Sequence, residues 1–99
     1  MIKGEGIYIY SIIAAKQRQE FGPIGIGARG DVVYTLHYQD LAAIVSRSPI
    51  VKYAVTRDNS LAHAKVVEKA MEAYTVLPVR FCTIAENEEM IIEMVLKNR

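Results

Sequence analysis

The hydrophobic pattern of residues 6–13 predicts a strand near the middle of a sheet. This segment is rich in β-branched and aromatic residues, and both of its alternating sets of positions are apolar. A strand with that pattern is covered on both faces. Residues 14–30 follow and hold four of the six glycines in the chain. We expect about two helical turns over residues 14–20 and a long flexible loop after them.

Two further apolar segments predict an antiparallel hairpin. Residues 31–38 alternate between two faces in the manner of a strand, and residues 41–46 form a third apolar run that Pro49 ends. Gln39 and Asp40 lie between the two segments and favour a turn. So short a connection is typical of neighbouring antiparallel strands.

A helix is predicted after this hairpin. Residues 58–60 are all favourable N-cap residues, and apolar side chains then recur at three- and four-residue spacing, which forms one stripe. The stripe contains Leu61, Ala64, Val67, Met71 and Tyr74. A β-branched pair at residues 75–76 ends the helix.

A fourth strand is predicted over residues 76–84, with Leu77, Val79 and Phe81 on one face. Because Pro78 cannot donate a hydrogen bond to a neighbouring strand, we expect this strand at a sheet edge. Arg80 lies among apolar residues and needs a carboxylate, backbone carbonyls or solvent as its partner. We expect His63 or a carboxylate to hold it. Both an exposed or ion-paired role and a binding role stay open for this arginine.

The last segment, residues 86–99, predicts a helix with a wide apolar face. Thr83 and Glu86 form a capping-box pattern. The apolar side chains of the helix span about two-thirds of its circumference and comprise Met90, Ile91, Ile92, Met94, Val95 and Leu96. A small domain does not easily cover that much surface. We therefore expect a two-fold homodimer through residues 86–99, with Ile92 and Leu96 in the contact.

Together these segments predict an α+β domain that spans residues 1–99. Its small sheet has four strands and is largely antiparallel, and two helices pack against one face of it. The order along the chain is strand, strand, strand, helix, strand, helix. A length of 99 residues with 52% hydrophobic content fits one domain with a modest core.

Charge and cysteine content exclude several classes of function. Twelve basic and eleven acidic residues leave a net charge of +1, so no strong field attracts nucleic acid or an anionic membrane. No apolar stretch reaches the length of about 18 residues that a membrane helix needs. The single cysteine, Cys82, cannot form an internal disulfide, which fits a reducing cytoplasm.

No arrangement of residues in the sequence predicts a catalytic, cofactor or metal site. Residues 25–30 match G-x-G-x-x-G, yet that motif binds dinucleotides only between a strand and a helix, and here it lies between a loop and a strand. His63 and His37 each lack a second metal ligand nearby in the sequence. Cys82 follows Phe81 in an apolar strand, which favours an inert thiol. We therefore expect no enzymatic activity.

Four blocks of the sequence together point to a known family. They are Gly6-Ile7-Tyr8-Ile9-Tyr10, Asp40-Leu41-Ala42-Ala43-Ile44-Val45-Ser46, the helix around Ala62-His63, and Leu77-Pro78-Val79-Arg80-Phe81-Cys82-Thr83. In this order they resemble the N-terminal domain of the gas vesicle GvpL/GvpF proteins, and they cover nearly the whole chain. The sequence departs from the family pattern at Cys82, where a glycine is usual. Family members are also generally longer, with a second α+β domain.

The resemblance implies a non-enzymatic accessory protein of gas vesicle assembly. Such a protein is a minor cytoplasmic component that contacts the small hydrophobic shell protein and other gas vesicle proteins. The resemblance supplies no catalytic residues and no cofactor. Candidate partner-binding residues in this chain are Arg80, Phe81, His63, Ile92 and Leu96.

The alternative is a small-molecule-binding regulatory domain of the same α+β class. A pocket between the sheet and the helix, lined by Tyr8, Tyr10, His63 and Arg80, would bind an anionic ligand in that case.

Overall fold

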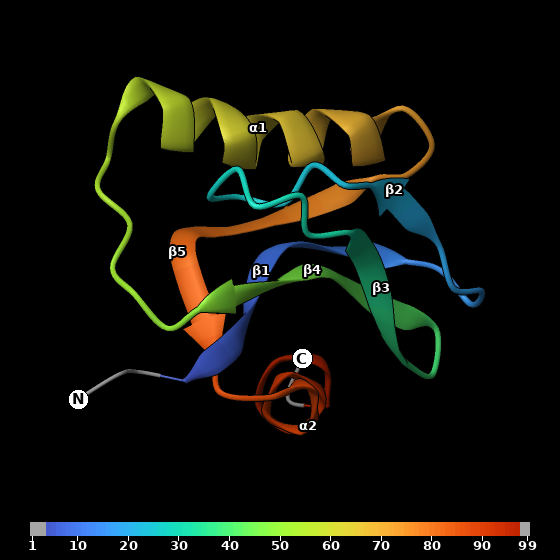
Figure 1. The fold of residues 1–99 in the computed structure, drawn as a ribbon. Helices are drawn as coiled ribbons and strands as arrows, with labels where there is room; N and C mark the ends of the chain where they lie inside the picture. Colours follow the sequence, from blue (N-terminus) through green and yellow to red (C-terminus); the bar gives the residue numbers. More distant parts are fainter. Residues whose placement is uncertain (1–3, 98–99) are drawn as a thin grey trace.

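A computed structural model describes residues 4–97 as one antiparallel sheet with a helical layer on each face (Figure 1). The strands are β1 (Glu5–Ala14), β2 (Glu20–Gly22), β3 (Val33–Tyr38), β4 (Leu41–Pro49) and β5 (Val76–Ala85). The helical elements are α1 (Arg57–Met71), α2 (Glu88–Ile91) and the π-helical turn η1 (Ile92–Leu96). The strand order is β2-β3-β4-β1-β5, and every pair is antiparallel. The α+β class is confirmed.

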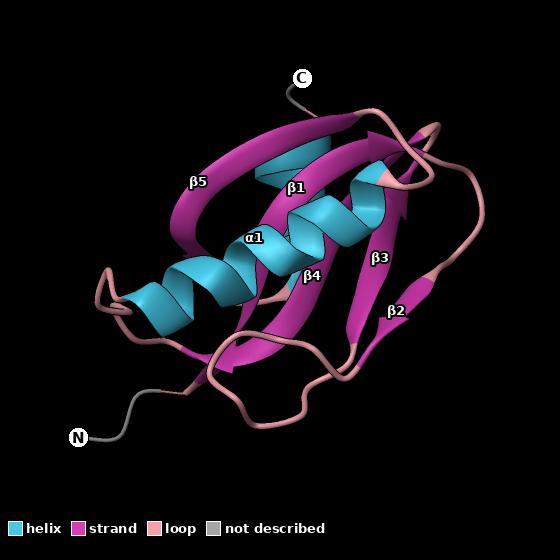
Figure 2. Cartoon of the chain, turned by 90° about the horizontal axis from the view of Figure 1, so that it is seen from above, coloured by secondary structure: helices cyan, strands magenta, loops and turns pink. Residues whose placement is uncertain are grey.

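Strand β1 is an inner strand that is buried on both faces, as its pattern predicts. Figure 2 shows α1 lying across the sheet over β1 and β4, while α2 and η1 lie beneath it in Figure 1. Tyr8 and Tyr10 of β1 belong to the core under α1, and Ile7 and Ile9 belong to the core over α2 and η1. The prediction that both helices cover one face is therefore wrong. A strand that is apolar on both faces needs a cover on each of them.

The sheet has five strands rather than the predicted four, because residues 20–22 form the short edge strand β2. The expected helical turns at residues 14–20 are absent: β1 continues to Ala14. Gln19 and Thr35 tie the start of β2 to β3. The Thr35 hydroxyl accepts from the Gln19 amide at 2.9 Å, and the Thr35 amide donates to the Gln19 carbonyl at 3.2 Å. A three-residue strand carries too little periodicity to be visible in the sequence.

The predicted hairpin and the predicted edge strand are confirmed. Strands β3 and β4 pair around a tight turn in which Gln39 has a positive φ of 54°. Strand β5 pairs on one side only, with β1, and it contains Pro78.

Helix α1 faces the sheet with a different stripe from the predicted one. Val66 and Ala70 are its fully buried residues, whereas Leu61 and Met71 are 54% and 61% exposed. At 100° per residue the buried stripe lies about a third of a turn from the predicted stripe. Thr56 caps the helix, because its side chain accepts from the Asn59 amide, so the predicted caps at residues 58–60 lie inside the first turn.

The C-terminal segment is shorter than predicted and changes its helical register. Asn87, and not Thr83, is the N-cap, and its side chain accepts from the Met90 amide at 2.8 Å. In η1 the Lys97 amide donates to the Ile92 carbonyl, five residues back, at 2.9 Å. Residues 98 and 99 of the predicted helix lie outside the described part of the chain.

The π-helical turn decides which side chains reach the sheet. In an α-helix, residues five apart differ by about 140° around the axis, so Ile91 and Leu96 would point in different directions. With bonds between residues five apart, both point to the sheet and are 0% and 2% exposed. Ile92 and Val95 pack partly buried against the same core. Only Met94, at 65%, is a largely exposed apolar side chain there, so much less apolar surface is left over than the α-helical pattern predicts.

The glycine-rich loop between β2 and β3 is held at two points rather than free. Ile26 is fully buried in the core under α1. Arg29 donates to both carboxylate oxygens of Glu5, at 2.8 and 2.9 Å, and to Asp31. No helix within residues 4–97 is both long and apolar enough to cross a membrane.

Candidate interaction site at the β5 bulge

Strand β5 contains a wide bulge opposite Tyr10. Ile9 pairs with Thr83 and Ser11 pairs with Pro78, so one residue of β1 faces four residues of β5, residues 79–82. The Thr83 hydroxyl donates to the Arg80 carbonyl at 2.7 Å and closes the bulge. Figure 1 shows the sharp bend of β5 that results.

The bulge separates side chains that the sequence pattern places together. Val79 packs against the core over η1, while Phe81 packs against the core under α1. The prediction that Leu77, Val79 and Phe81 share a face is therefore wrong for Phe81, which lies on the opposite face from Val79. Cys82 has a φ of 63°, the left-handed region in which glycine is favoured. The positive φ at this position explains why the family that the sequence resembles usually has a glycine here.

The Tyr8 hydroxyl joins β1, α1 and the bulge. It accepts a hydrogen bond from the Cys82 amide at 2.9 Å and lies 2.8 Å from Nδ1 of His63. Because the amide can only donate, the tyrosine proton is free to go to His63, which then accepts at Nδ1 and carries its own proton at Nε2. The structure thus brings the predicted residue His63 next to the bulge.

The surroundings of His63 are aromatic and uncharged. Its ring centroid lies 5.6 to 5.7 Å from those of Tyr8, Tyr10 and Phe81. Burial lowers the pKa of His63, and the Val79 carbonyl offsets part of that effect. Burial also raises the pKa of Tyr8 to about 12. The hydrogen bond between His63 and Tyr8 therefore joins two neutral groups at neutral pH.

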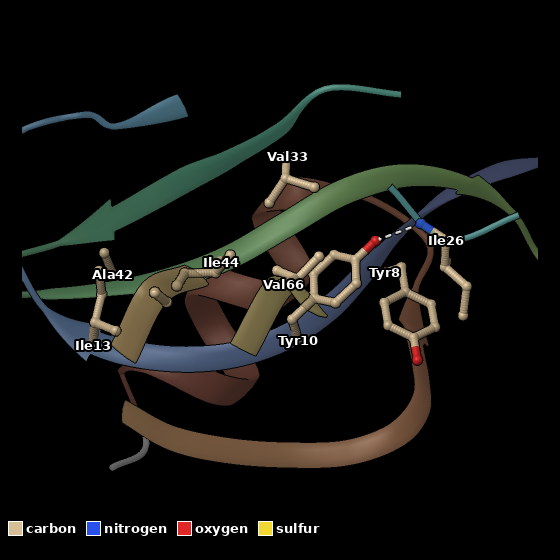
Figure 3. Close-up of a cluster of buried hydrophobic side chains, with 9 residues drawn as sticks. Tyr8, Tyr10, Ile13, Ile26, Val33, Ala42, Ile44 and Val66 are labelled. Atoms are coloured by element: carbon tan, nitrogen blue, oxygen red, sulfur yellow. Dashed lines mark hydrogen bonds between the residues drawn. The ribbon is translucent and has the colours of Figure 1, made fainter. Parts of the chain in front are cut away.

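The second tyrosine of β1 anchors the glycine-rich loop. The Tyr10 hydroxyl accepts from the Ile26 amide at 2.8 Å, as Figure 3 shows, and lies 2.7 Å from the Ser46 hydroxyl. Tyr10, Ser46 and Ile26 are all fully buried. Since an amide only donates, the Tyr10 proton is free to go to the Ser46 hydroxyl.

The small-molecule alternative needs the hydroxyl groups of Tyr8 and Tyr10 in a pocket, whereas in the described part of the chain these groups contact the protein itself. Tyr8 and Tyr10 are both 0% exposed, and their hydroxyl groups already bond to the protein. Four surface hollows on residues 4–97 are lined by other residues and not by Tyr8, Tyr10 or His63. Nor do three side chains of the types that bind metals gather anywhere in those residues.

Arg80 differs from its prediction. Its side chain is exposed, and it makes no hydrogen bond or ion pair with any residue between 4 and 97. The expectation that His63 or a carboxylate holds it is wrong, because His63 is turned toward Tyr8. Arg80 directly precedes Phe81 in the bulge and presents a free guanidinium at the surface.

A groove of about 430 Å³ runs beside the bulge. We call this hollow the bulge groove. Its lining residues come from β5 and from the segment between β4 and α1, and they are Ile50, Val51, Lys52, Phe81, Cys82 and Ile84. The Tyr53 amide donates to Cys82 Sγ at 3.2 Å, and the thiol lies 3.7 Å from the Val51 carbonyl. The segment after β4 is thereby attached to β5.

Gly6 is the residue that lets this groove form. A side-chain carbon at Gly6 would lie 2.5 Å from the Ala85 carbonyl oxygen and 2.8 Å from Cγ1 of Ile50. Sequence reasoning missed Gly6, Val51 and Lys52 as site residues. The glycine in the first block of the resemblance was the one available signal, because a glycine inside a strand marks a close approach.

Two of the predicted partner-binding residues lie elsewhere. Leu96 is 2% exposed and Ile92 is half-buried, both against the face of the sheet opposite α1. Leu96 therefore belongs to the core and cannot be presented to a second copy by the folded chain. The homodimer through residues 86–99 stays a prediction. The apolar residues of this segment that the fold leaves available for such a contact are Met94 and the exposed part of Ile92.

We expect the stability of the protein to fall below about pH 6.5 because of His63. The pKa of His63 in the folded state lies below the usual 6.5. The contribution of neutral His63 to the free energy of unfolding is therefore fully present above about pH 6.5. The contribution is lost as the pH falls toward the folded-state value, since the unfolded chain then binds more protons. Denaturant unfolding at about pH 7.5 and about pH 5 measures the difference. His63→Gln, which cannot titrate, should show a smaller loss; an equal loss in both proteins would contradict the assignment.

Comparison with known proteins agrees with this architecture. The sequence model of the family "Gas vesicle synthesis protein GvpL/GvpF" matches residues 6–99. Gas vesicle protein F of Nostoc sp. (strain PCC 7120 / SAG 25.82 / UTEX 2576) is 29% identical over 94 residues, which are 93% of this chain and 38% of that protein. The crystal structure of the gas vesicle protein GvpF from Anabaena sp. PCC7120 superposes with a TM-score of 0.78 at 26% identity.

That superposition covers 96% of this chain and 39% of the crystallised one. The chain thus spans about two-fifths of the length of the relatives it matches. Because the family match extends over nearly every residue, the four-block resemblance is confirmed. The chain belongs to the GvpL/GvpF family of gas vesicle synthesis proteins.

Proposed function

We propose that this protein is a non-enzymatic assembly factor that acts in the cytoplasm at the gas vesicle. The observation that carries the proposal is the family match over residues 6–99. The site chemistry supports it, because the Tyr8 hydroxyl bonds His63 and the Tyr10 hydroxyl bonds Ser46, so both tyrosine side chains hold parts of the protein together. These hydrogen bonds fix the position of the bulge and of the glycine-rich loop relative to the core.

We further propose that the protein contacts the hydrophobic shell protein, together with other gas vesicle proteins, through the surface of the β5 bulge. Phe81 and the exposed Arg80 lie in this surface, and His63 holds it in place through Tyr8. Side chains that combine an apolar contact with an unpaired charge are typical of binding surfaces.

Deletion and complementation in a gas-vesicle-producing strain test this function. Without the gene we expect vesicles to be absent or deformed, and the wild-type gene should restore them. Arg80→Glu should restore them poorly, since the new charge is opposite at an exposed contact position. Lys16→Glu is the matched control, because Lys16 is 80% exposed at the other end of β1, and its 3.8 Å surface ion pair with Asp40 contributes little to stability. Normal vesicles in the deletion strain would refute the proposed function.

A further inference from the structure

The bulge groove is a formed surface feature and not a consequence of a loose loop. Ile50 and Ile84 approach one another over Gly6, where no side chain intervenes. The thiol of Cys82 bonds the backbone of the segment after β4, and its amide bonds the buried Tyr8 hydroxyl. Both walls of the groove are therefore attached to the core.

The lining of the groove is apolar except at one end. Val51 is 43% exposed, and Phe81 and Ile84 are half-buried. Lys52 supplies the only charge among the lining residues. An opening of this kind accepts a large aliphatic side chain, whose apolar surface is favourably removed from water there.

Two cations, Lys52 and Arg80, belong to the groove or to the bulge that borders it, and neither has an ion-pair partner within residues 4–97. Arg29, which lies at this end of the sheet, is bound by Glu5 and Asp31. Arg80 has no such partner within residues 4–97, and neither does Lys52. A guanidinium forms its strongest hydrogen bonds with carboxylates, often in a two-pronged geometry.

We propose that the bulge groove binds a peptide segment of another protein in which a large aliphatic side chain is flanked by carboxylates. The aliphatic side chain lies between Val51 and Phe81, and the carboxylates pair with Lys52 and Arg80. The inference rests on the proposed function only for the identity of the protein that carries the segment. The charge pattern and the groove define the chemistry of that segment by themselves.

Titration of the full chain with short synthetic peptides tests the proposal. The probe has two leucines with glutamates on both sides, and the matched peptides replace either the leucines by alanine or the glutamates by lysine. Amide chemical shifts of the isotope-labelled chain report where each peptide binds. We expect saturable shifts confined to residues 50–52 and 80–84 with the probe, weakened by added salt, and little response to either matched peptide.

Two variants keep the test independent of folding. Arg80→Glu removes no contact of the described chain, so it should stay folded and bind the probe about tenfold more weakly or worse, equivalent to about 1.4 kcal/mol. Lys16→Glu changes the net charge equally and should bind normally. Equal binding of the lysine peptide, equal binding by both variants, or no saturation at millimolar probe would overturn the proposal. Normal vesicles in the deletion strain would remove the proposed function and leave this result standing.

Discussion

Tyr10→Phe is expected to lower the free energy of unfolding by about 2–4 kcal/mol, because it leaves two buried groups without a partner. The Tyr10 hydroxyl accepts from the Ile26 amide and bonds the Ser46 hydroxyl, and water reaches neither residue. The loss should appear as a lower denaturant midpoint at an unchanged slope.

Tyr38→Phe is the matched control for this substitution. Tyr38 is half-buried, and its hydroxyl has no hydrogen-bond partner among residues 4–97. We expect a change within about 0.5 kcal/mol. If Tyr10→Phe and Tyr38→Phe had the same small effect, the buried hydrogen bonds of Tyr10 would not contribute as the structure indicates.

Leu96→Ala is expected to destabilise the protein by about 2–5 kcal/mol, the usual result of emptying a well-packed core position. Leu96 is 2% exposed and packs with Ile7, Ile9 and Ile12 under the sheet. Met94→Ala is its control: Met94 is 65% exposed, and we expect an effect within about 0.5 kcal/mol. Equal losses for the two variants would contradict the π-helical register of η1.

The same residues separate folding from self-association. Sedimentation at micromolar concentration measures whether the chain is dimeric through residues 86–99, as the sequence analysis expects. A charge at Met94 should abolish such a dimer and leave the fold intact, whereas a charge at Leu96 should unfold the chain. A monomer at millimolar concentration would refute the dimer.

Much of the sheet could be predicted from the sequence, because its strands carry strong local patterns. The two apolar faces of residues 6–13, the turn at Gln39 and the position of Pro78 each reflect a local steric or solvation rule. Strand β2 could not be predicted, since its three residues are held by pairing with Thr35 and its neighbours rather than by their own periodicity.

The errors in the helices share one physical cause. Sequence periodicity assumes a regular α-helix and ranks side chains by hydrophobicity alone. Contact with Tyr8 and Tyr10 turns the half-polar His63 inward in α1, which rotates Leu61 outward. In the C-terminal segment the π-helical turn changes the angle between residues, so Ile91 and Leu96 share one face.

The candidate site was predictable only in part. Phe81, Arg80 and His63 were found because an arginine among apolar residues and the family blocks are visible in the sequence. The bulge was not visible, and it moves Phe81 to the opposite face from Val79. The lining residues Val51 and Lys52 come from a segment without regular structure, where no periodicity exists to read.

The two edge strands of the sheet, β2 and β5, are poorly suited to pair with a strand of another chain. Strand β2 is three residues long, and β5 has a proline without an N–H at position 78 and four residues out of the ladder. Neither border offers a continuous row of free amides and carbonyls that could template a strand from a second chain. Both borders therefore carry features that disfavour edge-to-edge pairing of strands between copies of this chain.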